Sequence, residues 1–297
     1  MARVRYEEIQ TRGALNRVRG MGFGWSLNPY QGCAHGCHYC FARRYHYFLN
    51  LSPDEDFSGI VFAKLNLPDV LRRELSRPSW RYERVAIGTA TDPYQPIEGK
   101  YRLTRRCLEV FCRKGSPISL VTKGTMVVRD QDLLAELARR AGCTVCFSIT
   151  TLDDALRSRL EPGTPPPLKR LWAMERLVLS GVNAGVLLAP VIPGITDSPA
   201  NLAEVVRGAA DHGACFLGTN VLHLREGTKE HFLSFLEQDY PWLKETYRGL
   251  YPGAFAPWRL KESLQTQVAA LKQLYGLKER YEAVEAPPRP SQLQLAL

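Results

Sequence analysis

The chain has 297 residues, of which 45% are hydrophobic and 23% charged, the proportions of an ordinary globular protein. No apolar run reaches the roughly 18 residues needed to cross a bilayer, and the arginine-rich stretch 1–20 lacks the apolar region of a secretory signal, so we expect a cytoplasmic protein without a membrane partner. The formal net charge of +9 favours polyanions such as nucleic acid, although a solvated basic surface explains this charge equally well.

Strands and helices are expected to alternate through the middle of the sequence. Apolar runs typical of strands buried on both faces recur there, each followed by a helical pattern. The expected strands are residues 84–89, 117–122, 144–150, 182–190 and 214–224. The expected helices are residues 103–114, 130–141, 152–160, 168–180 and 200–212. A further strand leads into Cys33, which brings the expected number of strands to six.

This alternation predicts an α/β fold with a parallel sheet and right-handed crossovers. Six strands fit a partial (β/α)6 barrel of the TIM type better than a full barrel of eight. No GxGxxG motif follows the first strand, which disfavours a dinucleotide-binding sheet. Polar or special residues lie at or just beyond the strand ends at Asp92, Lys123, Thr151 and Pro190, and that end of a β/α barrel carries the active site.

The pattern changes after residue 225. Residues 228–238 and 260–277 have amphipathic patterns and predict helices that cover the open side or the bottom of the barrel. Prolines and low apolar content near the C-terminus predict a flexible tail. The expected segments are a basic N-terminal segment (1–25), the partial barrel (26–225), a helical C-terminal extension (226–285) and the tail (286–297).

Three of the eight cysteines lie close together in NPYQGCAHGCHYCFARR, residues 28–44. In a long cytoplasmic chain, clustered cysteines bind metal or do chemistry more often than they form disulfides. At C-x3-C-x2-C spacing, Cys33, Cys37 and Cys40 can each bind one iron of a [4Fe–4S] cubane and leave the fourth iron without a protein ligand. Glycines within the segment permit the tight loop that this arrangement needs.

A structural zinc ion with His35 or His38 as its fourth ligand is the main alternative. Zinc sites usually combine two separated pairs of ligands, and no second CxxC or HxxxH pair in the sequence fits. Cys143 and Cys146 have CxxC spacing, but they lie in a predicted strand, where their side chains point to opposite faces. The pattern therefore favours an iron–sulfur cluster over zinc.

The segment CAHGCHYCF resembles the signature of the radical S-adenosylmethionine (SAM) superfamily. Further fragments follow in the order expected of its spore photoproduct lyase-like branch, and the resemblance spans about residues 28–240. These fragments are TATDPYQPIE, VTKG, FSITT, LEPGTPPPLKRL, APVIPGITD and VLHLREGTKEHF. The resemblance implies a radical SAM barrel with a [4Fe–4S] cluster, whose open iron binds the amine and carboxylate of SAM.

The resemblance also implies which residues contact SAM. The implied contacts are Tyr39 beside the cluster, Lys123 at the carboxylate, Ser148 at the ribose or methionine part, Ala189 beside the adenine, and Thr91 and Asp92 near the amine. From the residues alone, the alternatives are a solvated loop lysine at Lys123 and a small core residue satisfied by backbone at Ser148. Arg170 and Glu161 are expected to form a structural pair. His223 faces the substrate or is a hydrogen-bonded core residue.

The implied chemistry starts with an electron passed from the reduced cluster to SAM, which breaks into methionine and a 5′-deoxyadenosyl radical that abstracts hydrogen. By analogy with photoproduct lyase, we expect a DNA lesion or related nucleotide as substrate. The expected partners are nucleic acid and a one-electron donor such as flavodoxin or ferredoxin. Two alternatives stay open: a radical SAM enzyme acting on a peptide or metabolite, and a non-catalytic zinc- or cluster-containing nucleic-acid-binding module.

One departure from the family pattern concerns the hydrogen-atom donor. The photoproduct lyases carry a cysteine just before the strand-end aspartate, where this chain has Thr89, and a second tyrosine where it has Phe41. A threonine O–H bond is too strong to replace a thiol as donor. Cys146 is expected on the face of Ser148 but about 6–7 Å deeper in the barrel. Cys107 and Cys112 are expected on an outer helix, and Cys215 at the far end of a strand. The sequence therefore predicts no cysteine-dependent repair of spore photoproduct.

Overall fold

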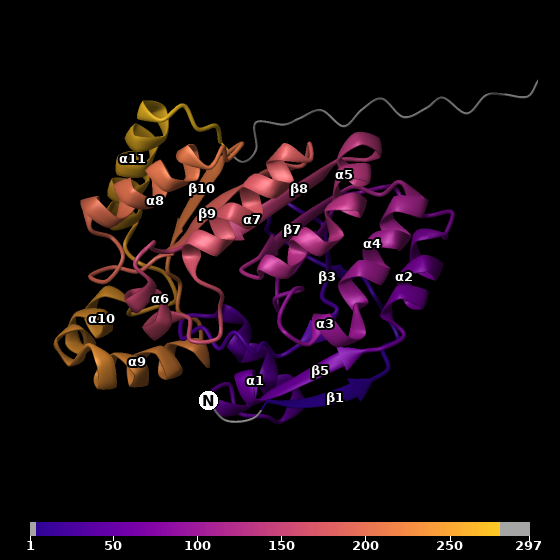
Figure 1. Ribbon diagram of the computed structural model, residues 1–297. Coiled ribbons are helices and arrows are strands. Elements are labelled where there is room, and N and C mark those ends of the chain that lie inside the picture. Colours follow the sequence, from indigo (N-terminus) through magenta and orange to yellow (C-terminus); the bar gives the residue numbers. More distant parts are fainter. Residues whose placement is uncertain (1–3, 280–297) are drawn as a thin grey trace, which may run out of the picture.

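The computed structural model describes residues 4–279, which form an open twisted sheet with helices packed against it (Figure 1). In this part of the chain the main sheet has seven strands in the order β10-β9-β8-β7-β6-β3-β2. The strands are β2 (Asn16–Arg17), β3 (Trp25–Leu27), β6 (Val85–Ile87), β7 (Ile118–Thr122), β8 (Cys143–Ser148), β9 (Asn183–Val191) and β10 (Leu217–Val221). Only β2 is antiparallel to its neighbour, which leaves six parallel strands. The predicted partial barrel is therefore confirmed.

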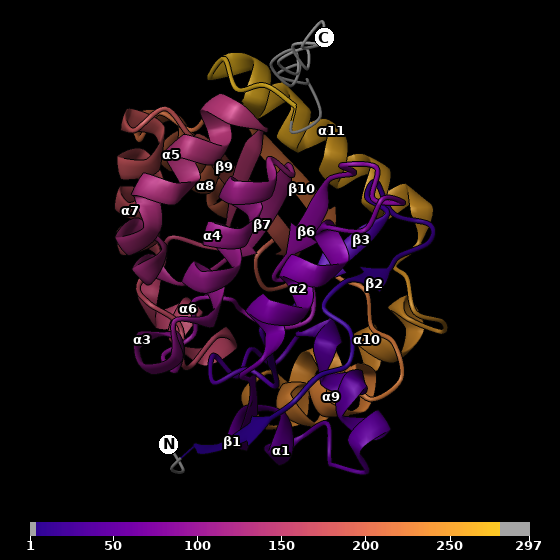
Figure 2. The same ribbon diagram turned by 90° about the vertical axis from the view of Figure 1, so that its right-hand side faces the viewer.

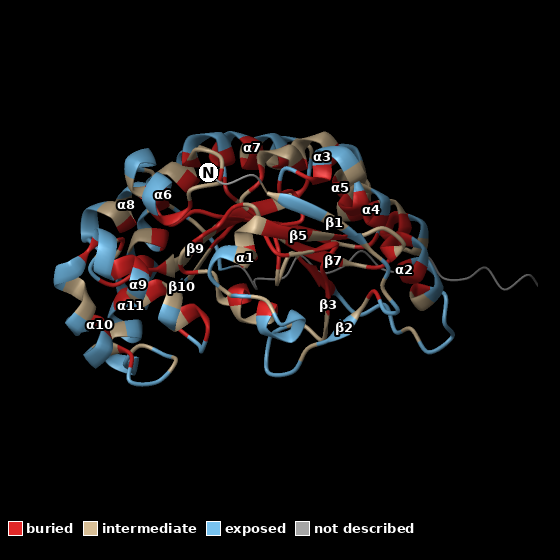
Figure 3. Ribbon diagram, turned by 90° about the horizontal axis from the view of Figure 1, so that it is seen from below, coloured by how far each residue is buried: buried red, intermediate tan, exposed pale blue. Residues whose placement is uncertain are grey.

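Helices that connect the parallel strands cover one face of the sheet (Figures 1 and 3). They are α3 (Glu98–Tyr101), α4 (Leu103–Lys114), the 3-10 helix η2 (Thr125–Asp130), α5 (Gln131–Arg140), α6 (Asp154–Leu160), α7 (Pro167–Leu179) and α8 (Pro199–Asp211). The predicted strands and helices between residues 84 and 224 agree with these bounds within three residues. In α4, Cys107, Leu108 and Phe111 share one buried face, and Gly115 ends the helix with φ 61°.

Side chains of the parallel strands alternate between two environments. Leu120, Val145 and Val186 are fully buried and belong to the main core between the sheet and the helices. The alternate residues Ser148 and Leu187 point to the other face and line a cavity. Each fully buried apolar side chain contributes about 1.5–3 kcal/mol. Burial of one face thus fixes the register that presents the other face to the cavity.

A second, smaller sheet was not expected from the sequence. Within the described residues it has the order β1-β5-β4, formed by β1 (Arg5–Ile9), β5 (Ile60–Lys64) and β4 (Tyr30–Gln31). The elements around it are the 3-10 helix η1 (Phe41–Leu49), α1 (Glu55–Gly59) and α2 (Leu67–Leu75). The strand β1 reads RYEEI and is largely exposed, so it has no apolar pattern that would reveal it. This sheet places β4 directly before the cysteine segment.

The C-terminal elements are α9 (Thr228–Asp239), the 3-10 helix η3 (Pro241–Leu243), α10 (Lys244–Leu250) and α11 (Trp258–Leu274). In Figures 1 and 2, α9 and α10 lie at the lower end of the molecule together with α1 and β1. Phe232, Phe235 and Tyr240 pack in one cluster with Cys37 and Tyr39, so this extension covers the cysteine segment. No helix among residues 4–279 is long and apolar enough to cross a membrane. The tail expected at 286–297 lies outside the described residues.

Candidate active site

A cavity of about 270 Å³ lies at the C-terminal ends of the parallel strands, between the sheet and the cysteine segment. Its walls include residues that follow or end β6, β7, β8, β9 and β10, as expected for a β/α barrel. The residues predicted to hold the cluster or to contact SAM all line this cavity: Cys33, Cys37, Tyr39, Cys40, Thr91, Asp92, Lys123, Ser148 and Ala189. The structure thus brings together residues that are up to 156 positions apart, from 33 to 189.

The cysteine loop is a series of tight turns. The amide of Gly36 donates to the carbonyl of Cys33 at 3.1 Å, and that of Cys40 to Cys37 at 3.3 Å. Gly32 has φ 79°, and a Cβ there would lie 2.3 Å from the carbonyl oxygen of Ile60. Only glycine fits this approach, so the loop wraps closely enough to aim its three thiols into one cavity.

The three thiols suit a metal cluster. Cys33, Cys37 and Cys40 are free thiols on one wall of the cavity. Burial raises the pKa of Cys37 to about 12, while Lys123 opposes the shift. A buried thiol of this kind becomes a thiolate when a metal replaces its proton. The donor set therefore fits three irons of a cubane, each held by one cysteine.

Arg43 fixes the back of the loop. Its side chain is buried and donates to the carbonyls of Cys37 and Gly36, both at 3.0 Å. The same guanidinium donates to the carbonyls of Pro53 and Asp54 at 2.9 Å. Four carbonyl oxygens thus share one buried cation, which holds the loop to the segment before α1.

The expected pair of Glu161 and Arg170 is present and buried, with 2.6 Å between Oε2 and a guanidinium nitrogen. Burial alone would raise the pKa of Glu161, but Arg170 and Lys123 outweigh it and bring the pKa to about 2. Tyr39 donates its hydroxyl to Glu161. A Cβ at Gly163 would lie 2.2 Å from the carbonyl of Ala34. The 161–167 loop is therefore fitted against the cysteine loop.

Asp92 is a buried anion at the end of β6. Its carboxylate accepts from the hydroxyl of Thr122 at 2.7 Å and the amide of Lys123 at 2.6 Å, and His35 Nδ1 lies 3.3 Å away. Burial alone would raise the pKa of Asp92, but His35 and these donors outweigh it and lower the pKa to about 2. Asp92 thus places a fixed negative charge on the cavity wall.

Thr91 is placed by Gln95, a residue that the sequence analysis missed. The hydroxyl of Thr91 donates to the carbonyl of Gly32 at 2.6 Å, and Gln95 Nε2 donates to the same carbonyl at 3.1 Å. Gln95 also accepts from the amide of Ala34 at 2.9 Å. Its signal in the sequence was its place in TATDPYQPIE, three positions after the strand-end aspartate. Thr91 and Gln95 together bind the loop after β6 to the cysteine loop.

Lys123 is half-buried at the end of β7, and its Nζ lies 5.5 Å from the centre of the Tyr39 ring. Burial alone would lower its pKa, but the charges of Cys37 and Glu161 outweigh it, so the pKa is raised. It is therefore a cation inside the cavity and not a solvated loop lysine.

Ser148 is buried at the end of β8, and its hydroxyl donates to the carbonyl of Ala189 at 2.9 Å. Arg170 donates to the Ser148 carbonyl at 3.0 Å. The peptide bond between Ala189 and Pro190 is cis. The hydroxyl of Ser148 is thus satisfied by backbone, as one of the two readings expected, while the residue still forms part of the cavity wall.

The zinc alternative finds no ligand set in the structure. His35 faces Asp92, and His38 is stacked on Phe235 with its Nδ1 3.0 Å from Nε2 of His231. Among residues 4–279, no group of three or more His, Cys, Asp or Glu side chains is placed to hold one metal ion. A cubane differs from zinc in that each thiol binds a different iron.

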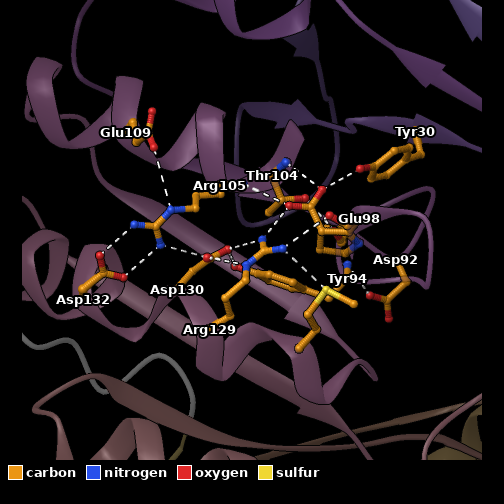
Figure 4. A network of polar contacts seen from close by, with 12 residues as sticks. Tyr30, Asp92, Tyr94, Glu98, Thr104, Arg105, Glu109, Arg129, Asp130 and Asp132 are labelled. Atoms are coloured by element: carbon orange, nitrogen blue, oxygen red, sulfur yellow. Dashed lines mark hydrogen bonds and ion pairs between the residues drawn. The ribbon is translucent and has the colours of Figure 1, made fainter. Parts of the chain in front are cut away.

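A polar network extends from Asp92, which lines the cavity, to Asp132 (Figure 4). Arg129 bridges two fully buried carboxylates, with 2.8 Å to both Glu98 and Asp130. Tyr94 donates its hydroxyl to Asp130 at 3.0 Å and its amide to Asp92 at 2.8 Å. Other members of the network are Tyr30, Thr104, Arg105 and Asp132. The network therefore holds the loop that carries Asp92.

The family model of the radical SAM superfamily matches residues 27–206, a range that contains the cysteine loop and every cavity residue predicted from the sequence. This chain belongs to the radical SAM superfamily. Radical SAM enzymes use a [4Fe–4S] cluster and SAM, and these are its cofactors.

Related chains extend over most of its length. An uncharacterized protein of Mycobacterium tuberculosis is 38% identical over 298 residues, covering 99% of this chain and 86% of that protein. An uncharacterized protein of Methanocaldococcus jannaschii is 26% identical over 79% of this chain and 83% of its own. A radical SAM Nα-GlyT isomerase of Pseudomonas phage M6 is 26% identical over 56% of this chain and 33% of that protein.

Solved structures with the same fold include spore photoproduct lyase. Its complex with dinucleoside spore photoproduct has a TM-score of 0.69 and 17% identity, covering 91% of this chain and 79% of that one. A variant with bound AdoMet and the same dinucleoside gives the same score. At this identity the likeness shows a shared radical SAM fold.

The cavity also contains residues that the sequence did not single out. Asn220 lies on β10 where the pairing with β9 is irregular between Thr219 and Val221, and its Oδ1 accepts from the Val221 amide at 3.0 Å. Such an irregularity has no sequence signature, so nothing could have identified Asn220. Phe41 and His223 line the cavity with Asn220.

Proposed function

We propose that this enzyme holds its [4Fe–4S] cluster with Cys33, Cys37 and Cys40, cleaves SAM to a 5′-deoxyadenosyl radical, and directs the radical at a nucleic-acid lesion or related nucleotide. The proposed cluster and SAM sites are supported by one observation: the three thiols line the same cavity as Lys123 and Asp92. The bound cofactors supply the radical chemistry, and the chain's own residues bind and orient SAM and the substrate.

The charges in the cavity match the ends of SAM. Lys123 provides the cation for the carboxylate, and Asp92 with Thr91 forms the wall for the methionine amine. The ring of Tyr39 lies beside Lys123 and packs in one cluster with Cys37. Ser148 and Ala189 form the wall on β8 and β9 where ribose and adenine are proposed to lie. Thr91 and Ser148 already donate to backbone carbonyls, so their oxygens can only accept, and the oxygen of Thr91 already accepts from Gln95 Nε2 at 2.9 Å.

Three facts support a nucleic-acid substrate. The net charge is +9, the solved spore photoproduct lyase complex contains a dinucleoside photoproduct, and the cavity ends in aromatic side chains. A peptide or metabolite substrate is the rival. The phage relative is named an isomerase, so a rearrangement in which no external hydrogen donor is needed is the rival reaction class.

The proposal also includes the source of the hydrogen atom that the product receives. Thr89 and Phe41 both line the cavity at the positions where the lyases carry cysteine and tyrosine. Cys146 is buried on β8 and is not among the lining residues of this cavity. We therefore propose that the product does not receive its hydrogen from a cysteine outside the cluster loop.

Two measurements test the two halves of the proposal. Protein reconstituted without oxygen should form 5′-deoxyadenosine from SAM and a strong reductant. Its affinity for DNA should fall with salt along a straight log–log line, whose slope is about 0.9 for each phosphate contacted. If the enzyme forms 5′-deoxyadenosine but does not bind DNA at low salt, its substrate is a peptide or a metabolite instead of nucleic acid.

A further inference from the structure

A row of five aromatic rings has two of its members in the wall of the cavity. Phe41 and His223 lie in the middle, with ring centres 5.6 Å apart. On one side Phe255 lies 6.0 Å from His223. On the other side Tyr45 lies 6.4 Å from Phe41, and Phe48 lies 6.3 Å from Tyr45 with the two rings stacked. We call these five residues the ring row.

Exposure increases along the ring row from the cavity outwards. Phe41 and His223 line the cavity and are half-buried, whereas Phe255 is 64% exposed and Phe48 is 77% exposed. The two halves come from distant segments, since η1 follows the cluster loop and Phe255 precedes α11. A short β-bridge joins His223 to Phe255, and the amide of Leu224 donates to the carbonyl of Ala254 at 2.7 Å. The backbone therefore holds His223 and Phe255 next to each other.

Positive charge accompanies the exposed end. The guanidinium of Arg225, which is exposed, lies 5.9 Å from the centre of the Phe255 ring. Further along the chain, the guanidinium of Arg259 lies 5.6 Å from the ring of Trp258, which is 67% exposed. Burial and the charge of Arg225 lower the pKa of His223, so its ring is neutral near pH 7 and adds no charge inside the row. Flat rings with arginines beside them suit a ligand with both π-faces and phosphates.

We propose that the ring row is a stacking platform for the bases of a single-stranded or locally opened nucleic acid, which guides one nucleotide into the cavity while Arg225 contacts a phosphate. This inference rests on the proposed nucleic-acid substrate and deepens it. Continuity with the cavity is the reason to favour bases over a docked electron-donor protein. The middle rings of the ring row line the cavity in which the reaction is proposed to take place, whereas the surface of a docked protein could reach only the outer rings.

The test compares two DNA strands of equal length and charge. Fluorescence anisotropy measures the Kd of the reconstituted enzyme for a short oligothymidylate and for a fully abasic strand. The platform predicts tighter binding of the strand with bases. Phe48→Ala and Phe255→Ala should each weaken binding of oligothymidylate by about five- to 100-fold and leave binding of the abasic strand unchanged. Phe255→Tyr should restore the preference, since the ring is kept.

Trp172→Ala is the matched control, because Trp172 is an exposed aromatic on α7 and does not line the cavity. It should bind both strands as the unaltered enzyme does. Equal affinity of the unaltered enzyme for both strands would overturn the platform and leave the proposed substrate class standing. The platform would also be overturned if Phe48→Ala and Phe255→Ala kept the full preference for bases while flavodoxin reduced their clusters more slowly. That result would make the ring row a docking surface for the electron donor. Failure to bind either strand at low salt would overturn both the platform and the nucleic-acid half of the proposed function.

Discussion

The side chain of Arg43 is bound to the backbone of Cys37, with Nε 3.0 Å from the carbonyl oxygen. The guanidinium is buried and satisfies four carbonyls, so its removal leaves buried acceptors without a donor. We predict that Arg43→Met lowers the free energy of unfolding by about 3 kcal/mol and lowers the iron content after reconstitution. Chemical denaturation and an iron assay measure both quantities. Arg139→Met, at an exposed arginine on α5, is the control, and equal values for the two variants would refute this role.

Lys123 is expected to bind the carboxylate of SAM. We predict that Lys123→Ala weakens SAM binding by about 1.5–3 kcal/mol, the range for a hydrogen bond to a charged group. The backbone amide that donates to Asp92 is kept in this variant, so the loop should not move. Equilibrium dialysis with labelled SAM gives the affinity. Lys169→Ala, an exposed lysine on α7, should bind SAM normally. An unchanged affinity in Lys123→Ala would show that the carboxylate lies elsewhere.

Glu161 makes the stability depend on acid pH. Its pKa is about 2 in the folded chain against 4.5 in the unfolded chain, so its ionised form stabilises the fold. This contribution, about 3 kcal/mol, is complete above pH 4.5 and is lost as the pH falls towards 2. Glu161→Gln leaves Arg170 buried without its anion and should cost about 3–5 kcal/mol at pH 7. The free energy of unfolding of the cluster-free protein is measured at several pH values. Between pH 4.5 and 2 it should decrease less in Glu161→Gln than in the unaltered chain. An identical pH dependence would contradict the assignment.

The hydrogen donor can be tested with a spore-photoproduct dinucleotide, SAM and a reductant. Because Thr89 stands where the lyases have cysteine, we predict no clean multiple-turnover conversion to thymines by a cysteine-dependent route. Conversion that survives replacement of each cysteine outside the cluster loop would leave the substrate analogy right and point to another donor. Conversion that is lost in Cys146→Ala would show that Cys146 reaches the substrate from its buried place on β8.

The parts of the fold that could be predicted are those in which burial imposes a pattern. Helix α4 has apolar residues at a period of 3.6 because it buries one face, and strand β8 is an apolar run because all six of its residues are buried. Lys123 and Asp92 could be placed because strand ends of a β/α barrel meet at one edge. The strand β1 and helix η1 have no such pattern, since β1 is an exposed edge and η1 presents Tyr47, Phe48 and Leu49 to solvent.

What the sequence could not show is how distant side chains support the site. The contacts of Arg43 with Pro53 and Asp54, and of Gln95 with the cysteine loop, depend on the tertiary path of the chain. The ring row joins residues from 41 to 255 and exists only because the C-terminal extension folds back over the cavity mouth.

Formation of 5′-deoxyadenosine tests the central claim most directly. Protein reconstituted without oxygen should carry about four irons and four sulfides per chain and should convert SAM to 5′-deoxyadenosine when a strong reductant is added. Cys33→Ala, Cys37→Ala and Cys40→Ala should each abolish the product, whereas Cys215→Ala, outside the cluster loop, should keep it. A chain that binds stoichiometric zinc without acid-labile sulfide, or that carries the cluster and yields no 5′-deoxyadenosine, would contradict this account.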